Sequence, residues 1–287
     1  MGRGKSPTSP ANDDKPSNRS NHDQIYDTVY FSASEWRTIN GGLNRLPLSF
    51  HPLVNKDTHM NRKIERIQYT QKGGKSNSSA TPKVELSWRD NTPRKGNRDT
   101  KLHTSTYDYA LISAPFTVVR SWRLPNTLPT TITNAINNLG YAAACKVALE
   151  YSSRFWEHYA NPIVGGCSTT TDIPGIGSIC YPSYNINGTG KATILASYAQ
   201  VDWPASLSEE EHVKLVLDAM TEIHGEESRK LYTGKYNRRC WAHDPLEGGA
   251  SWANPSIGQH QLYIPEYFKT YDGVSCCLAD CGWMDGC

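Results

Sequence analysis

The sequence predicts an α+β fold in which helices flank a mixed β-sheet. Alternating apolar and polar residues predict strands at Val84–Trp88 and Cys145–Tyr151, and the run Ile194–Tyr198 predicts another. Two helices are expected between and after these strands, one beginning at Pro129 and one at Ser208. Because helices and strands alternate without a strict strand–helix–strand repeat, a mixed sheet covered by helices is favoured over a parallel one.

The helix after Ser208 is the best-defined element. Ser208 and Glu211 are spaced as a capping box, in which each residue's side chain bonds the free backbone N–H of the other. Its apolar positions follow the helical period: Val213, Val216, Leu217, Met220 and Ile223. The helix that Pro129 opens ends at Gly140 and carries on one face Ile132, Ala135, Ile136 and Leu139.

Four further segments complete the predicted order. Tyr107–Ala114 is expected to be a second, more buried strand, and residues 70–82 and 89–106 are expected to be hydrophilic loops. Phe155 and Trp156 supply a large apolar anchor after the strand that ends at Tyr151.

Length and composition set the class of protein. With 287 residues, 37% of them hydrophobic and 20% charged, the chain can bury one large core or two ordinary ones. It has no apolar run long enough to span a membrane and no signal-peptide core, so we expect a cytoplasmic or otherwise intracellular chain. Residues 1–24 are rich in Pro, Ser, Asn and Asp, which predicts a disordered leader.

Basic residues do not point to nucleic acid. They are concentrated before residue 107 but lie scattered among Ser, Asn, Asp and Thr, with no aromatic platform repeating between them. No nucleic-acid partner is therefore expected.

The eight cysteines form two groups. Cys145, Cys167, Cys180 and Cys240 stand in apolar or aromatic contexts, which predicts buried thiols in a reducing compartment. The second group is Cys276, Cys277, Cys281 and Cys287. Their spacing is not that of a zinc site, and no histidine is near, so no metal is expected. Residues 272–287 are interpreted as an atypical cysteine-rich tail.

Familiar catalytic and nucleotide motifs are incomplete. Gly175–Cys180 begins like a dinucleotide fingerprint but lacks its third glycine and follows a proline, so it predicts a turn. No nucleophile, base and acid can be grouped from spacing. Glycosylation sequons at Asn18, Asn77 and Asn187 leave open a glycosylated binding module.

An ordered series of segments resembles the flavin-containing amine oxidases, most closely the fungal L-amino-acid oxidase-like proteins. It covers roughly residues 28–271 and includes Asn40–Pro47, Asn61–Ile67, Leu139–Lys146, Phe155–Trp156, Gly165–Asp172, Cys180–Pro182 and Arg238–Phe268. The resemblance implies a substrate-binding domain of the flavin amine oxidase type, with flanking helices and fragments of the FAD-binding domain.

The same resemblance implies an activity and its residues. The reaction is oxidative deamination of an L-amino acid or amine, with hydride transfer to N5 of FAD and oxygen reduced to peroxide. Lys146 matches the lysine that holds a water near N5, and Trp241 an aromatic wall beside the flavin ring. Ile64 matches a contact of the cofactor's adenine side. Substrate positions are Tyr181, for which Tyr184 is an alternative, and Ala250. Self-association is left open.

Two family elements have no match in this sequence. We find neither the N-terminal βαβ unit with GxGxxG nor the C-terminal Gly–Glu pair that meets the flavin pyrophosphate. We therefore expect impaired FAD binding by this chain, with a truncated, non-catalytic substrate-domain fragment as the alternative.

Overall fold

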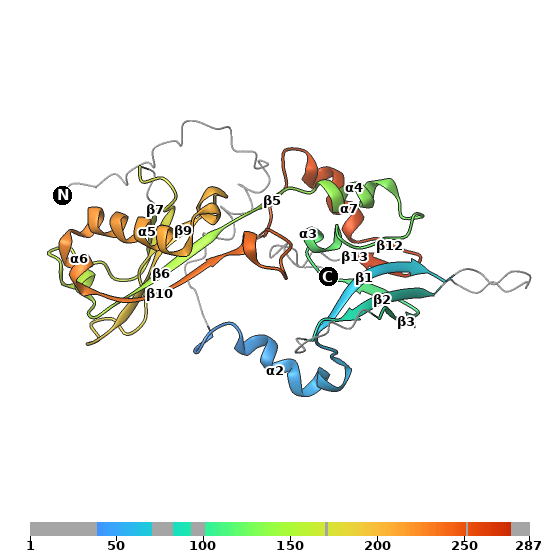
Figure 1. Cartoon of the computed structure of the whole chain (residues 1–287), viewed down its shortest axis with the longest axis horizontal. Coiled ribbons are helices and arrows are strands. Elements are labelled where there is room, and N and C mark those ends of the chain that lie inside the picture. The colour runs from blue at the N-terminus through green and yellow to red at the C-terminus, as the bar shows by residue number, and fades with distance from the viewer. Residues whose placement is uncertain (1–38, 71–82, 93–100, 170–171, 251, 277–287) are drawn as a thin grey trace, which may run out of the picture. The chain divides into compact units, whose positions relative to one another are not determined.

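The computed structural model describes residues 39–70, 83–92, 101–169, 172–250 and 252–276 (Figure 1). They form two compact units. One is Tyr141–Asn254, and the other combines the described parts of Asn18–Gly140 and Pro255–Cys287. The predicted leader, residues 1–24, lies outside the described residues.

The first unit is built on a five-stranded antiparallel sheet. In spatial order its strands are β10 (Tyr232–Cys240), β6 (Cys145–Tyr151), β9 (Ala192–Ala199), β8 (Ser178–Cys180) and β7 (Cys167–Thr169). A separate pair joins β5 (Tyr141–Ala142) to β11 (Trp252–Ala253). The strands predicted at Cys145–Tyr151 and Ile194–Tyr198 are thus confirmed, and β6 alternates buried and half-buried residues along its whole length.

Helices cover one face of this sheet. They are α5 (Glu209–His224) and α6 (Glu226–Leu231). The unit also contains short 3₁₀ turns, η2 (Phe155–His158), η3 (Trp203–Ser206) and η4 (Trp241–His243). The capping box of Ser208 and Glu211 is present in both directions, and the helix ends at Gly225 with a φ of 77°. The predicted stripe is buried at Val213, Val216 and Met220, whereas Ile223 is exposed.

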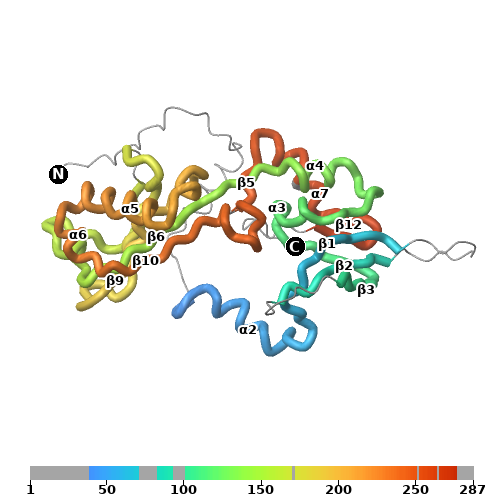
Figure 2. Tube along the Cα trace, in the orientation of Figure 1, coloured from blue at the N-terminus to red at the C-terminus, as the bar shows by residue number. Residues whose placement is uncertain are grey.

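The core of this unit lies between α5 and the sheet. Val216 and Met220 pack with Leu149 of β6 and Ile194 of β9, all fully buried. The anchor predicted after β6 is confirmed, because the Trp156 ring is also fully buried in this cluster. Figure 2 traces how β6, β9 and β10 run beside these helices.

The second unit contains a three-stranded meander and a smaller sheet. The meander is β1 (Arg62–Tyr69), β2 (Val84–Asp90) and β3 (His103–Tyr107), all antiparallel. The smaller sheet runs in the order β12 (Thr270–Tyr271), β13 (Val274–Cys276) and β4 (Ala110–Ile112). Its helical segments are α2 (Arg45–Val54), η1 (Asn55–Asp57), α3 (Phe116–Val119), α4 (Thr130–Asn138) and α7 (Gln259–Tyr267).

The helix predicted after Pro129 is confirmed as α4. Its buried residues are Ile132, Ala135 and Ile136, and Leu139 caps its C-terminus. The side chain of Gln259 then joins α7 to this end, donating to the Asn138 carbonyl at 2.7 Å and accepting from the Gly140 amide at 2.9 Å.

The strand predicted at Tyr107–Ala114 is wrong in extent and burial. The chain bends at Asp108, so that β3 closes the meander and β4 joins the other sheet. Tyr109 and Leu111 are 74% and 66% exposed, whereas Ile112 is buried. Similarly, the predicted loop 89–106 includes the end of β2 and the start of β3.

The prediction of buried free thiols is also wrong. Cys145 is disulfide-bonded to Cys240, and Cys167 to Cys180. In both cases the two cysteines lie directly opposite each other on neighbouring antiparallel strands. Strand register therefore brings together sulfurs that are 95 and 13 residues apart in the chain, a proximity that spacing alone does not reveal.

The predicted tail begins inside the smaller sheet. Val274–Cys276 forms β13, which pairs with β12 in antiparallel and with β4 in parallel fashion. Residues 277–287 lie outside the described part. Among the helices that the structure describes, none combines the length and apolar character needed to cross a membrane.

One histidine is fully buried in the first unit. Arg238 Nε donates to Nδ1 of His212 at 3.0 Å, so Nε2 carries the proton of a neutral ring. Burial, and secondarily the Arg238 charge, lower the pKa of His212 to about 4. The unfolded chain takes up this proton near pH 6.5, so between these values acid favours unfolding.

We therefore predict that the free energy of unfolding falls as the pH is lowered from about 6.5 to 4, by up to roughly 3 kcal/mol from this group. A His212→Asn variant keeps an acceptor for Arg238 but does not titrate. Urea unfolding at several pH values should show a shallower pH dependence in that variant. Equal slopes for both proteins would mean that His212 does not control acid stability.

Candidate active site

Lys146 lies in a row of three side chains on one face of the sheet. Directly opposite it stand Tyr198 of β9 on one side and Arg239 of β10 on the other. Residues directly opposite on antiparallel strands project to the same face, and their Cβ atoms are about 5 Å apart. Two cations are therefore neighbours on this face.

The Lys146 ammonium is held by aromatic rings. Its Nζ lies 4.4 Å from the centre of the Tyr198 ring and 5.3 Å from that of Trp241. Among the described residues no carboxylate forms an ion pair with it. Burial lowers the pKa of Lys146, because an ammonium loses hydration when it is enclosed. The structure thus brings together two of the predicted site residues, Lys146 and Trp241.

A short turn after β10 places Trp241. The Trp241 amide donates to the Ala144 carbonyl at 3.1 Å, which continues the β6–β10 ladder by one step. The Asp244 amide then bonds the Trp241 carbonyl at 2.9 Å. The buried Asp244 carboxylate accepts from Arg239 on one oxygen and from the Leu246 amide, at 2.8 Å, on the other. This turn anchors both Trp241 and Arg239.

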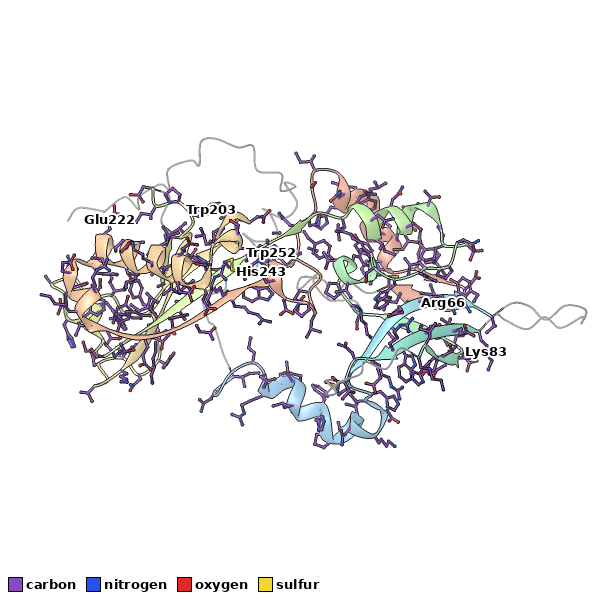
Figure 3. All side chains as sticks on the ribbon, in the orientation of Figure 1. Arg66, Lys83, Trp203, Glu222, His243 and Trp252 are labelled. Atoms are coloured by element: carbon purple, nitrogen blue, oxygen red, sulfur yellow. A yellow bond between two sulfur atoms is a disulfide. The ribbon has the colours of Figure 1, made fainter. Side chains whose placement is uncertain are left out.

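Ala250 is buried shortly before β11. Trp252 of that strand meets the Tyr198 ring edge-on, with centroids 6.5 Å apart, and is labelled together with His243 in Figure 3. The Tyr198 ring is thus contacted by Trp252 as well as by the Lys146 ammonium.

The predicted turn at Gly175 positions the strand that carries Tyr198. Residues 174–176 form a turn, and Gly177 makes an isolated bridge to Tyr198. Gly177 has a φ of 67°, and a Cβ there would collide with the Tyr198 carbonyl. Only glycine permits this approach, so the motif serves packing.

Tyr181 lies elsewhere in the first unit. Its ring is buried in the core, and its hydroxyl is 2.7 Å from His224 Nε2. The Tyr159 hydroxyl is 3.2 Å from Nδ1 of the same ring. Burial, followed by the neighbouring Tyr159, raises the pKa of Tyr181 to about 12. Tyr184, the alternative, has a 69% exposed side chain.

Ile64 belongs to the second unit and lines a pocket of about 290 Å³ there. Lys63, Arg66, Arg89 and Arg123 also line it, with Glu65, Leu102 and Ser121. Glu65 is paired with Arg89 at 2.9 Å. Three of the four basic side chains have no ion pair with a described residue, so the pocket favours an anion.

Cys145, Cys240 and His212 are close enough to suggest a metal site, since one atom from each lies within 4.8 Å of the others. The sulfurs are joined in a disulfide, however, and the hydrogen bond from Arg238 leaves the proton on Nε2. A metal ligand needs a thiolate or a free ring nitrogen. In this state none of the three side chains can ligate.

Sequence reasoning missed two members of the site. Tyr198 lies in a predicted strand and Arg239 in the segment Arg238–Phe268, but the sequence assigns neither residue a functional role. What identifies them is their position, because both lie directly opposite Lys146. Only the register of the three strands shows this.

Comparisons with known proteins identify the family. The family model described as flavin containing amine oxidoreductase matches residues 8–286. The L-amino-acid oxidase of Neurospora crassa is 56% identical over 88% of this chain and 35% of its own length. That of Siganus canaliculatus is 28% identical over 86% of this chain and 44% of its own. The chain thus spans a third to a half of these relatives.

Solved structures show the same fold. Putrescine oxidase bound to putrescine superposes with a TM-score of 0.63 at 12% identity, covering 84% of this chain and 47% of that one. Cyclohexylamine oxidase from Brevibacterium oxydans gives 0.60 at 14% identity, with coverages of 82% and 46%. Since the family model matches nearly the whole sequence, this chain belongs to the flavin-containing amine oxidase family.

Proposed function

We propose that this chain supplies the substrate-side half of an FAD-dependent oxidase that deaminates an L-amino acid or amine and forms peroxide from oxygen. The observation that carries the proposal is the Lys146 ammonium, held half-buried between Tyr198 and Trp241. Because the chain spans only part of its relatives, the activity is proposed for the complete protein.

The residues around Lys146 fit a flavin. Trp241 and Tyr198 offer flat, half-buried rings suited to a flat cofactor, and Lys146 offers a cation with N–H donors. When bound, a flavin accepts a hydride from the carbon that bears the amino group and later passes both electrons to oxygen.

Lys146 stabilises the charge that this chemistry creates. Its ammonium lies in a partly dehydrated position, where a fixed positive charge favours negative charge developing nearby. The same N–H groups can hold a water by hydrogen bonds. Burial keeps the Lys146 pKa below its ordinary value, which eases transfer of a proton from Nζ.

Arg239 favours an amino acid over a simple amine as the substrate. Its guanidinium shares the face of Lys146 and is 57% exposed although Asp244 anchors it. A carboxylate is the group that two neighbouring cations attract. Ala250, which is small and buried, remains our candidate for shaping the substrate pocket. Tyr181 also remains a candidate, but carboxylate binding would have to replace its bond to His224.

For the complete protein we predict that Lys146→Met lowers the turnover number about 10²-fold, the usual effect of losing one fixed electrostatic stabiliser. Peroxide release with L-amino acids measures it. The matched control is Lys191→Met, which removes an exposed lysine paired with Glu150. Equal activity of both variants would contradict a role for Lys146, and absence of peroxide from the parent would favour a non-catalytic fragment.

We further propose that the basic pocket around Ile64 takes the anionic, adenine-nucleotide portion of FAD. An FAD pyrophosphate is doubly charged, which suits a pocket lined by Lys63, Arg66 and Arg123. Arg66→Gln should weaken binding of FAD about tenfold, the result of losing about 1.4 kcal/mol.

Titration of flavin fluorescence measures this affinity, with ADP as a competitor. Lys83→Gln is the control, because Lys83 is exposed, pairs with Asp108 and does not line the pocket (Arg66 and Lys83 are labelled in Figure 3). If both variants bind FAD as tightly as the parent, the pocket does not take the nucleotide.

The two disulfides bear on the compartment. Disulfides persist where thiols are oxidised, which weighs against the reducing, cytoplasmic location expected from the sequence. Asn187 provides a test, because its sequon lies in an exposed loop. We predict that the chain isolated from cells that make it shifts in mobility on glycosidase treatment.

The shift should become smaller in Asn187→Gln, which leaves the sequons at Asn18 and Asn77, and be unchanged in Asn185→Gln, a nearby exposed asparagine outside any sequon. An unshifted chain whose Cys145, Cys167, Cys180 and Cys240 react as free thiols would instead support a reducing, intracellular location.

A further inference from the structure

Trp241 directly follows strand β10, and the sequence of this strand specifies its register only weakly. It is the edge strand of the sheet, hydrogen-bonded on one side only, to β6. Four consecutive residues, 234–237, are exposed. Its register against β6 is irregular between Tyr232 and Tyr236, around Gly234 with a φ of 81°. Polar, glycine-containing strands of this kind are prone to slip.

A slip by one residue would dismantle the candidate site. Side chains alternate between faces, so such a shift moves every side chain of a strand to the opposite face relative to its neighbour. Arg239 would then leave the face of Lys146. Trp241, which follows the last rung, would lose its amide bond to the Ala144 carbonyl and its place beside the ammonium.

The disulfide lies where this slip would have to begin. Cys240 is directly opposite Cys145, and the next residues along the two strands are Trp241 and Lys146. Both cysteines are almost fully buried, on the face opposite to Lys146. The bond therefore holds the last rung of the ladder without occupying the face on which the site is built.

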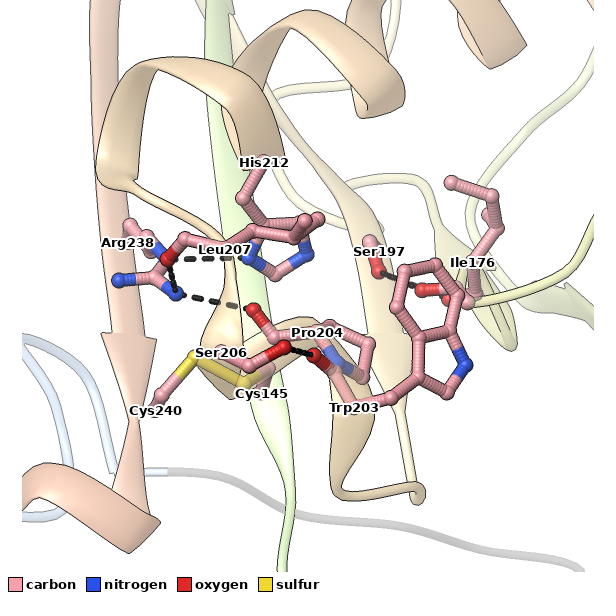
Figure 4. The surroundings of a disulfide bond; sticks show 11 residues. Cys145, Ile176, Ser197, Trp203, Pro204, Ser206, Leu207, His212, Arg238 and Cys240 are labelled. Carbon is pink, nitrogen blue, oxygen red and sulfur yellow. Dashed lines mark hydrogen bonds between the residues drawn. A yellow bond between two sulfur atoms is a disulfide. The ribbon is translucent and has the colours of Figure 1, made fainter.

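A second contact on the same face supports this rung but does not replace it. Arg238 bonds His212 of α5 and the carbonyls of Pro204 and Leu207, at 3.0 and 3.1 Å (Figure 4). These bonds fix the side chain of Arg238 and would also break in a one-residue slip, but each is a non-covalent contact that can open and re-form. A disulfide has no comparable freedom, because its Cα atoms stay within a few ångströms.

We propose that Cys145 and Cys240 are positioning residues, whose disulfide sets the register of β10 and thereby holds Trp241 beside Lys146. Their importance for oxidation rests on the proposed function. The placement of Trp241 against Lys146 does not, and it can be measured without flavin or substrate.

The test compares two pairs of substitutions in the full chain. Cys145→Ala with Cys240→Ala removes the disulfide that is proposed to set the register. Cys167→Ala with Cys180→Ala removes the other cross-strand disulfide, between β7 and β8, which has no contact with Lys146. The readouts are the rate at which Lys146 is acetylated, followed by peptide mass spectrometry, and the emission of Trp241, taken as the difference from a Trp241→Phe background.

Both pairs should lower the melting temperature, since both lose a cross-link. Only the first pair should increase Lys146 acetylation severalfold and shift Trp241 emission to the red, as both side chains become exposed. A lower melting temperature with unchanged acetylation and emission would overturn the proposal and leave the disulfide as a stabilising link only.

A rescue variant separates the effect of a changed strand register from the effect of removing two buried sulfur atoms. Ala148 and Asn237 are directly opposite in the same ladder. Ala148→Cys with Asn237→Cys, added to the first pair, restores a covalent link at another rung, and should return acetylation and emission to the parent values. If the first pair does not fold, a folded rescue variant in which Lys146 acetylation and Trp241 emission equal those of the parent supports the proposal. Altered values in a folded, cross-linked rescue variant contradict it.

Discussion

The candidate site depends on the antiparallel ladder between β6 and its two neighbours. Lys146 gains its surroundings because Tyr198 and Arg239 stand opposite it, one on each side. Placing two cations on adjacent strands costs stability, and the structure offsets it differently for each. Arg239 is paired with the buried carboxylate of Asp244, whereas the Lys146 ammonium lies against the rings of Tyr198 and Trp241 and has no ion pair with a described residue.

The other face of the same strands supplies rigidity. Leu149 and Ile194 pack against α5, and the disulfide at the end of β6 lies on this side, near His212 and Arg238. Because side chains alternate along β6, one face of the strand packs against α5 and the other face carries Lys146. Buried residues hold the sheet to the helix, while half-buried residues, Lys146 among them, lie on the face of the candidate site.

Family membership and geometry contribute different parts of the functional argument. The family match and the L-amino-acid oxidase relatives show the family, while the solved amine oxidases establish only the fold at 12% to 14% identity. Our proposal of an amino acid over an amine rests on the chain itself, where Arg239 lies opposite Lys146 as a second cation.

The sequence by itself determined those elements that depend on residues close together in the chain. The capping box at Ser208 and the alternation in β6 were predictable because propensity, capping and period act within a few residues. It also indicated the family, and with it Lys146 and Trp241. Tertiary structure alone decided strand register. Register joined Cys145 to Cys240 across 95 residues and set Arg239 opposite Lys146, because pairing between distant strands depends on packing that no local pattern encodes.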